Sequence, residues 1–242
     1  MNVESAAVNI LKRGVELDTK KRYTEALVCY QEGLQILVDK MKGEPDESMR
    51  NYLRKKVEEY MNRAETIKKI VLNQKEAGQF HEQVHIENNS TGHSFKALFG
   101  RFLDDELQYV VVEDPYIRNF HQCQNFLRLC ELLVRSSQNL RHIELVTSRD
   151  ARSEGDQRQW FSDLAADLLK YRVTLIVKYS ETLHDRQITL SSGWIIKIGR
   201  GLDFYKPPDN KFCLGVYDLD LRPCHETTVD IVHSKNVKQS YG

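Results

Sequence analysis

Apolar residues recur at steps of three and four along the first third of the chain, which is the spacing of amphipathic helices. This spacing predicts helices at about residues 3–18, 22–42 and 47–77. Gly43 and Pro45 separate the second helix from the third, because glycine tolerates a helix end and proline cannot continue one. Three helices with short connections predict an antiparallel bundle. The apolar face of the first helix contains four residues: Ala7, Ile10, Leu11 and Val15.

Beyond residue 79 the pattern changes to short β-branched runs that alternate with helical runs. Strand, helix, strand, helix, strand implies parallel pairing through right-handed crossovers, and therefore an α/β domain. The turn-rich stretch at residues 88–92 predicts that residues 79–92 form a linker. The expected elements are a short helix at 94–103, strands at 109–113, 141–147 and 173–179, helices at 119–135 and 157–171, a hairpin at 186–198, and strands at 212–221 and 227–233.

The change of pattern predicts a multidomain protein. We expect an all-α three-helix bundle at residues 1–78, the linker at 79–92 and an α/β domain at 93–242.

Composition is that of a soluble globular protein, with 29% charged and 40% hydrophobic residues. Lys and Arg number 35, as do Asp and Glu, so attraction to an anionic partner must come from local clustering. The five cysteines are odd in number and form no C-x-x-C pair, which indicates reduced thiols and no zinc site or cofactor. No signal peptide and no run of eighteen apolar residues is visible, so we expect a cytoplasmic protein that could still lie on a membrane.

Met61 lies outside the inward face of the third helix, among charged and polar neighbours. One interpretation is a single exposed methionine, which is ordinary. The alternative is a groove between the second and third helices that accepts the apolar residues of a partner helix, with Glu65 pairing with a basic residue of that helix.

Three sequence motifs bear on this choice: R-Y-x-E-A-L at 22–27, C-Y-Q-E-G-L at 29–34 and E-Y-M-N-R-A-E at 59–65. Over residues 3–77 the chain resembles MIT domains, three-helix modules that bind C-terminal helical motifs of ESCRT-III subunits, the charged multivesicular body proteins. The resemblance implies that the motif docks between helices two and three. The groove it implies contains Leu34, Val38, Val57, Met61, Glu65 and Lys68.

The second chemical signal is a basic segment that follows a predicted strand. Between residues 170 and 206 there are seven basic and three acidic residues, a local surplus in a neutral chain. Phosphate binding is one interpretation, and a solvated face without function is the other. The candidate phosphate-binding or lipid-binding residues are His184, Arg186, Lys197, Arg200, Lys206 and Arg222. Trp194, Phe204 and Tyr205 lie among them and could stack on bases, but we expect them in the core and do not expect nucleic-acid binding.

Residues 183–205 resemble a degenerate copy of the phospholipase D motif H-x-K-x-x-x-x-D, which that superfamily normally uses twice per active site. His184 stands for the histidine, Arg186 for the lysine, and Ser191 for the aspartate. A second motif is absent, so the resemblance implies this fold without catalytic residues. The alternative is a phosphodiesterase that assembles a two-histidine site across a homodimer.

The whole arrangement resembles proteins in which an MIT domain precedes a phospholipase-D-like domain. The resemblance implies a dimeric, non-catalytic adaptor that binds ESCRT-III and acidic phospholipids, including phosphoinositides. It also implies action in abscission during cytokinesis, with a peripheral location on late-endosomal membranes and at the midbody.

Overall fold

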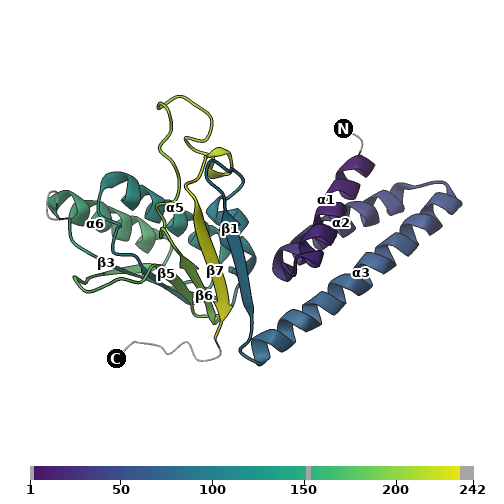
Figure 1. The fold of residues 1–242 in the computed structure, drawn as a ribbon, viewed down its shortest axis with the longest axis horizontal. Coiled ribbons are helices and arrows are strands. Elements are labelled where there is room, and N and C mark those ends of the chain that lie inside the picture. Colours follow the sequence, from purple (N-terminus) through teal and green to yellow (C-terminus); the bar gives the residue numbers. More distant parts are fainter. Residues whose placement is uncertain (1–2, 151–153, 235–242) are drawn as a thin grey trace. The chain divides into compact units, whose positions relative to one another are not determined.

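The structure is a computed structural model that describes residues 3–150 and 154–234. The chain divides into two compact units, residues 1–80 and 81–242 (Figure 1). The division confirms that a helical part precedes an α/β part, as the sequence predicted.

The first unit consists of α1 (Val3–Thr19), α2 (Tyr23–Gly43) and α3 (Glu47–Glu76). The Asp46 side chain caps α3 by accepting hydrogen bonds from the backbone nitrogens of Ser48 (2.8 Å) and Met49 (3.4 Å). Helix α2 packs against both other helices. The buried apolar residues of this unit include Ala7, Leu11, Leu17, Ala26, Tyr30, Leu37, Leu53, Ile67 and Val71.

The predicted inward face of α1 is wrong at one position. Val15 is exposed, whereas Leu17 is buried. The reason is Gly14, which is buried and whose hypothetical Cβ would lie 3.1 Å from the ring of Tyr30. The missing side chain lets α2 approach at this point, so the face of α1 runs through Gly14 and Val15 turns outward.

The second unit contains one seven-stranded sheet with strand order β1-β7-β6-β5-β2-β3-β4. Strands β2, β3 and β4 are parallel, as predicted. β5 pairs antiparallel with β2, and β6, β7 and β1 follow, each antiparallel to the strand before it. The strands are β1 (His81–Ile86), β2 (Tyr109–Glu113), β3 (His142–Thr147), β4 (Thr174–Tyr179), β5 (Gln187–Leu190), β6 (Trp194–Ile198) and β7 (Thr227–His233).

Helices α5 (Phe120–Ser136) and α6 (Glu154–Lys170) connect the parallel strands. Because β2, β3 and β4 are neighbours in sequence order, right-handed crossovers place both helices on one face of the sheet (Figure 1). The short helix α4 (Phe95–Phe99) and the 3₁₀ turn η1 (Gly100–Phe102) precede β2, and α4 packs against α5. No helix in the described ranges is long and apolar enough to cross a bilayer.

The predicted linker at 79–92 is wrong, because it contains strand β1 at the edge of the sheet. The strand has few apolar residues because a glutamate takes one of its inward positions. Glu82 is 5% exposed and forms an ion pair with Arg101, with Nη2 and Oε1 2.6 Å apart. A charged residue on the inward side weakens the alternating pattern by which strands are recognised.

The predicted strand at 212–221 is also wrong. This segment is irregular and ends in the 3₁₀ turn η2 (Leu219–Leu221). Gly215 has φ +83°, which interrupts extended backbone in the middle of the segment. The apolar alternation that suggested a strand instead places Phe212 and Leu214 in solvent.

Candidate functional site

The six predicted phosphate-binding residues divide between two hollows in the second unit. His184, Arg186 and Lys197 line a shallow depression of about 440 Å³, together with Asp185 and Asp230. Two carboxylates here balance the arginine and the lysine. This depression is therefore not strongly cationic.

Arg186 is held in place by its neighbours in this depression. Its Nη1 donates to the carbonyl oxygen of Gly199 at 3.0 Å, and its guanidinium carbon lies 4.1 Å from the centre of the Tyr116 ring. The side chain is therefore oriented by a carbonyl and an aromatic face.

The second hollow is a cavity of about 590 Å³ beside the N-terminal half of α5. Two histidines, His121 and His225, also line it. Asp203 is the one carboxylate among its lining residues. Its arginine and lysine residues are Arg128, Arg200, Lys206, Lys211 and Arg222. With five such cations against one carboxylate, the cavity has a strongly positive character in a chain of zero net charge.

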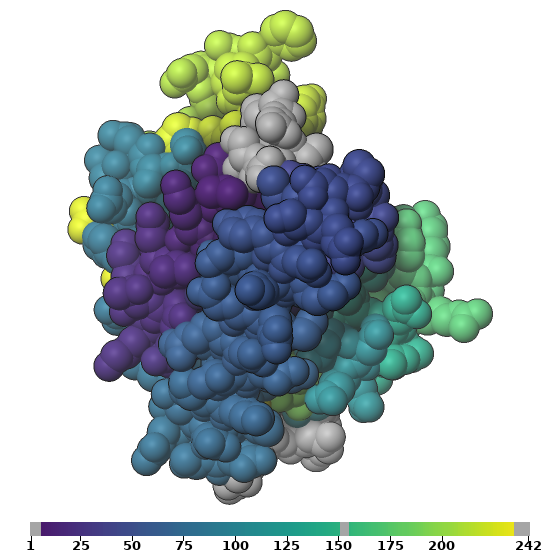
Figure 2. Space-filling model, turned by 90° about the vertical axis from the view of Figure 1, so that its right-hand side faces the viewer, coloured from purple at the N-terminus to yellow at the C-terminus, as the bar shows by residue number. Residues whose placement is uncertain are grey.

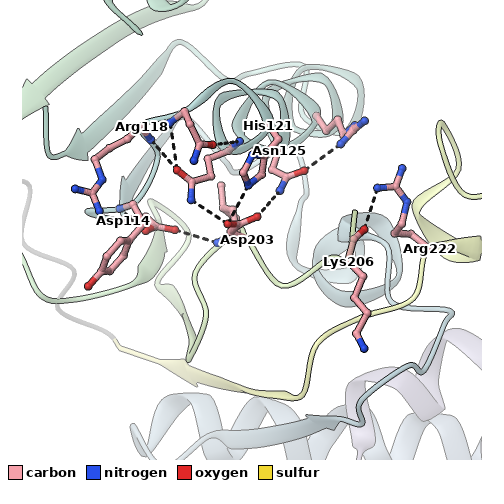
Figure 3. A network of polar contacts seen from close by, with 12 residues as sticks. Asp114, Arg118, His121, Asn125, Asp203, Lys206 and Arg222 are labelled. Carbon is pink, nitrogen blue, oxygen red and sulfur yellow. Dashed lines mark hydrogen bonds and ion pairs between the residues drawn. The ribbon is translucent and has the colours of Figure 1, made fainter. Parts of the chain in front are cut away.

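Helix α5 begins beside this cavity, and a reciprocal capping box between Asn119 and Gln122 fixes its first turn. The Asn119 side chain accepts a hydrogen bond from the backbone nitrogen of Gln122, whose side chain in turn accepts from the Asn119 nitrogen. The Asp203 carboxylate then accepts from Gln122 Nε2 (2.9 Å) and Asn125 Nδ2 (3.4 Å), and lies 3.4 Å from His121 Nε2 (Figure 3). These contacts fasten the segment after β6 to α5.

The Gly-Arg-Gly sequence at 199–201 has a structural explanation. Asp114 is buried and accepts hydrogen bonds from the backbone nitrogens of Tyr116 and Leu202, each at 3.0 Å. Gly201 has φ +62°, and a Cβ there would lie 1.9 Å from an Asp114 oxygen. Burial raises the pKa of Asp114, while the two backbone donors act in the opposite direction. The glycine is therefore required by a turn and by the close approach of a carboxyl group.

Arg222 directs three of its five N–H donors at backbone carbonyls. It donates to the oxygens of Gly215, Val216 (3.0 Å) and Lys206 (3.2 Å; Figure 3). Burial lowers its pKa, and the nearby Arg128 acts in the same direction. This geometry favours a role in shaping the cavity wall over the direct phosphate contact that the sequence suggested.

Arg200 and Lys206 each make one side-chain contact that leaves further donors. Arg200 Nε donates to the backbone carbonyl oxygen of Glu226 at 3.2 Å, and Lys206 Nζ donates to Asn89 Oδ1 at 2.6 Å. An arginine has five N–H donors and a lysine has three, so both retain capacity for an anion. The pKa of His225 is lowered by burial and then by these two cations, which favours its neutral form.

Sequence reasoning missed Arg128, Lys211 and His121. Arg128 and His121 come from α5, more than forty residues before the start of the basic segment, and only the fold brings them to it. Conversely, Lys170 and Lys178 contributed to the predicted charge surplus but form ion pairs elsewhere, with Asp167 (2.6 Å) and Glu144 (2.9 Å).

The aromatic residues of the basic segment are in the core, as expected. Trp194, Phe204 and Tyr205 are all buried, and Tyr205 donates its hydroxyl to the His93 carbonyl oxygen at 2.8 Å. Base stacking on these rings is therefore not available.

In the first unit, the predicted groove residues lie on α2 and α3. Leu34, Val38 and Val57 are half-buried. Met61 is 48% exposed, and Glu65 and Lys68 are also exposed. The steps of four, four and three from Val57 place the four α3 residues on one side of that helix. The surface combines an accessible methionine with a carboxylate and an amine.

Known proteins share both parts of this arrangement. Residues 4–69 match the MIT (microtubule interacting and transport) domain family, and residues 92–233 match the family described as the phospholipase D-like domain at the C-terminus of MIT. The chain is 48% identical over 236 residues to MIT domain-containing protein 1 of Mus musculus, which covers 97% of this chain and 95% of the mouse protein. The chain therefore belongs to the family of proteins in which an MIT domain is followed by a phospholipase D-like domain.

Proposed function

We propose that this protein is a non-catalytic adaptor between ESCRT-III and acidic membranes, acting in abscission during cytokinesis. The observation that carries the proposal is the cavity beside α5, with five arginine and lysine residues and one carboxylate. Such a concentration of cations on a neutral chain suits the phosphates of acidic lipids, including phosphoinositides.

The first unit supplies the other half of the adaptor. The surface of Leu34, Val38, Val57 and Met61 takes the apolar residues of an ESCRT-III helix, and Glu65 pairs with a basic residue of that helix. Each apolar anchor contributes about 1.5–3 kcal/mol before ordering costs, which gives a weak and reversible contact. A homodimer of such chains would multiply the weak contacts. The adaptor role implies a peripheral location on late endosomes and at the midbody.

Two observations favour an adaptor over a dimeric phosphodiesterase. Ser191, which stands where the catalytic motif has its aspartate, accepts hydrogen bonds from the backbone nitrogens of Gln108 (2.9 Å) and Tyr109 (3.2 Å). Its hydroxyl therefore ties the β5–β6 turn to β2. Arg186, which stands for the motif's lysine, is oriented by the Gly199 carbonyl oxygen and the Tyr116 ring.

Vesicle binding by the full chain tests the membrane half of the proposal. We expect the double variant Arg200→Glu/Lys206→Glu to bind vesicles of phosphatidylcholine and phosphoinositide about 30-fold more weakly or worse, at about 1 kcal/mol for each cation removed. The residual binding should be insensitive to salt, because the screened attraction is gone. Co-sedimentation measures both effects.

The matched control is Lys96→Glu/Arg135→Glu, which changes the net charge equally at two exposed residues that do not line the cavity. Equal losses in the two double variants would contradict a localised lipid site. Phosphodiesterase turnover on lipid or nucleic-acid substrates that vanishes in His184→Ala would overturn the adaptor in favour of an enzyme.

The helical surface is tested by Met61→Asp. A charge at this half-exposed position should weaken binding of ESCRT-III C-terminal peptides by about tenfold or more. The reason is that the new carboxylate would lose its water when an apolar side chain of the peptide packs against it. Titration calorimetry measures the affinity. Met49→Asp, at a methionine of the same helix that is 38% exposed, is the control and should bind like the unsubstituted protein.

A further inference from the structure

Residues 207–217 expose three large apolar side chains on an irregular segment between β6 and β7. Phe212 is 99% exposed, Leu214 is 84% exposed and Tyr217 is 91% exposed. The segment, drawn in yellow-green, extends beyond the end of the sheet in Figure 1 and forms a protrusion at the top of Figure 2. Clustered apolar side chains with this much exposure indicate a surface that meets an apolar partner.

The base of this segment is fixed by buried structure. Arg222, which is 6% exposed, donates to carbonyl oxygens at the end of the segment, at Gly215 and Val216, and to that of Lys206 just before its start. Arg128 reaches the same Val216 oxygen at 3.5 Å. The two guanidinium groups therefore hold the base from which the apolar tip extends.

Cations surround the foot of the same segment. Lys206, Lys211 and Arg200 line the cavity that Tyr217 and Val216 also line, so the apolar tip rises from the cationic zone. An anionic bilayer presents the complementary sequence of layers, with phosphates at its surface and hydrocarbon beneath. A second copy of this chain, meeting the same face across a two-fold axis, would oppose one cationic zone to another.

We propose that residues 207–217 insert Phe212, Leu214 and Tyr217 into the interface of an anionic bilayer, while the cationic cavity at their foot binds a lipid phosphate. The inference rests on the proposed membrane function and adds the mode of attachment. Insertion contributes an attraction that depends on apolar area and that salt does not screen.

The first test uses the full chain and vesicles of phosphatidylcholine with phosphatidylserine. We expect Phe212→Ser/Leu214→Ser to bind about tenfold more weakly or worse, since two apolar side chains no longer enter the bilayer. Its thermal unfolding should be unchanged, because both side chains are exposed. The control is Leu169→Ser, at a residue of α6 that is 60% exposed and lies outside the segment.

The second test reports depth directly. Phe212→Trp should lose fluorescence on vesicles whose acyl chains carry bromine, and Leu169→Trp should not. The natural tryptophans, Trp160 and Trp194, provide the background signal of the unsubstituted protein.

The outcomes separate this inference from the proposed function. Vesicle binding that survives Phe212→Ser/Leu214→Ser, or a Phe212→Trp signal that bromine does not quench, overturns insertion and leaves headgroup binding standing. A change of oligomeric state in the serine variant without loss of vesicle binding assigns the segment to a contact between copies and overturns insertion. No binding of the unsubstituted protein to anionic vesicles overturns both.

Discussion

The role of a basic residue in this chain depends on what already occupies its donors. Arg222 and Arg200 both line the cationic cavity, yet Arg222 donates to three backbone carbonyls and Arg200 to one. An arginine with most of its donors on backbone carbonyls holds the wall, whereas one with most of its donors spare can bind an anion. Arg186 also donates to one carbonyl, but its guanidinium lies in addition against the Tyr116 ring, which fixes its orientation.

Gly201 is the residue at which one added methyl group should be most damaging. Gly201→Ala requires a side chain at φ +62° and places its Cβ 1.9 Å from Asp114 Oδ2, which would break the Asp114–Leu202 hydrogen bond. We expect the free energy of unfolding of the second unit to fall by about 2–4 kcal/mol. Urea unfolding followed by tryptophan fluorescence measures this, because both tryptophans lie in this unit.

Gly155→Ala serves as the control for this experiment. Gly155 lies in α6, and a Cβ there meets no atom within 4 Å. Alanine should be neutral or slightly stabilising in a helix. Equal unfolding curves for the two alanine variants would show that the Asp114 contact does not constrain residue 201.

At the scale of elements, the helices of the first unit are joined by a polar contact as well as by their core. Asp18 near the end of α1 accepts two hydrogen bonds of 2.7 Å from Arg63 on α3. Tyr30 of α2 donates to the same carboxylate at 3.2 Å. Burial, followed by the Asp18 charge, raises the pKa of Tyr30 to about 12. One carboxylate thus connects all three helices.

This contact predicts a pH-dependent stability. Hydrogen bonding from Arg63 lowers the pKa of Asp18 in the folded state, so the contribution is present above the unfolded value of about 3.9 and is lost as pH falls through the lowered folded value. We expect Arg63→Met to cost about 1 kcal/mol at neutral pH, a modest figure because the Arg63 side chain is 45% exposed. The difference between the variant and the unsubstituted protein should begin to shrink below about pH 4 and disappear below the lowered folded pKa of Asp18.

Far-ultraviolet circular dichroism of thermal unfolding at several pH values measures this difference. Lys56→Met is the control, since Lys56 pairs only with its own helix neighbour Glu59 among the ion pairs described for α3. A pH-independent difference for Arg63→Met would exclude Asp18 as its origin.

At the scale of the whole molecule, the boundary of the second unit decides which pieces of the chain are stable. Strand β1 lies between the two family matches, since the first ends at residue 69 and the second begins at residue 92. It nevertheless pairs with β7 along six residues. A fragment that starts at residue 92 lacks β1, leaves the edge of β7 uncovered and deletes the carboxylate partner of Arg101.

We therefore expect a fragment of residues 79–234 to be more stable than one of residues 92–234. In the full chain, Glu82→Ala should cost about 3 kcal/mol, because it removes the 2.6 Å ion pair of an Arg101 side chain that is 6% exposed. His85→Ala, on the exposed side of the same strand, should change little. Thermal unfolding by tryptophan fluorescence compares the four proteins, and equal midpoints would show that β1 is dispensable.

Local periodicity was enough to predict the three helices of the first unit and the parallel strands of the second. Apolar residues recur every three to four positions in such helices and every two positions in such strands. Elements adjacent in the sequence are here also adjacent in space. The motifs at 22–34 and 59–65 likewise indicated the MIT family, because they lie within single helices.

The cationic cavity was decided by the tertiary structure. Arg128 and His121 approach Lys206 and Lys211 only through the packing of α5 beside the segment after β6, and charge counting along the chain cannot detect such a juxtaposition. The same limit explains why the sequence predicts a linker where β1 lies, since Glu82 is compatible with a buried strand only beside Arg101. The sequence by itself determined which elements form and what kind of domains they make. The tertiary structure alone decided which charged side chains use their hydrogen-bond donors within the protein and which keep donors for a ligand. That depends on contacts between residues distant in sequence.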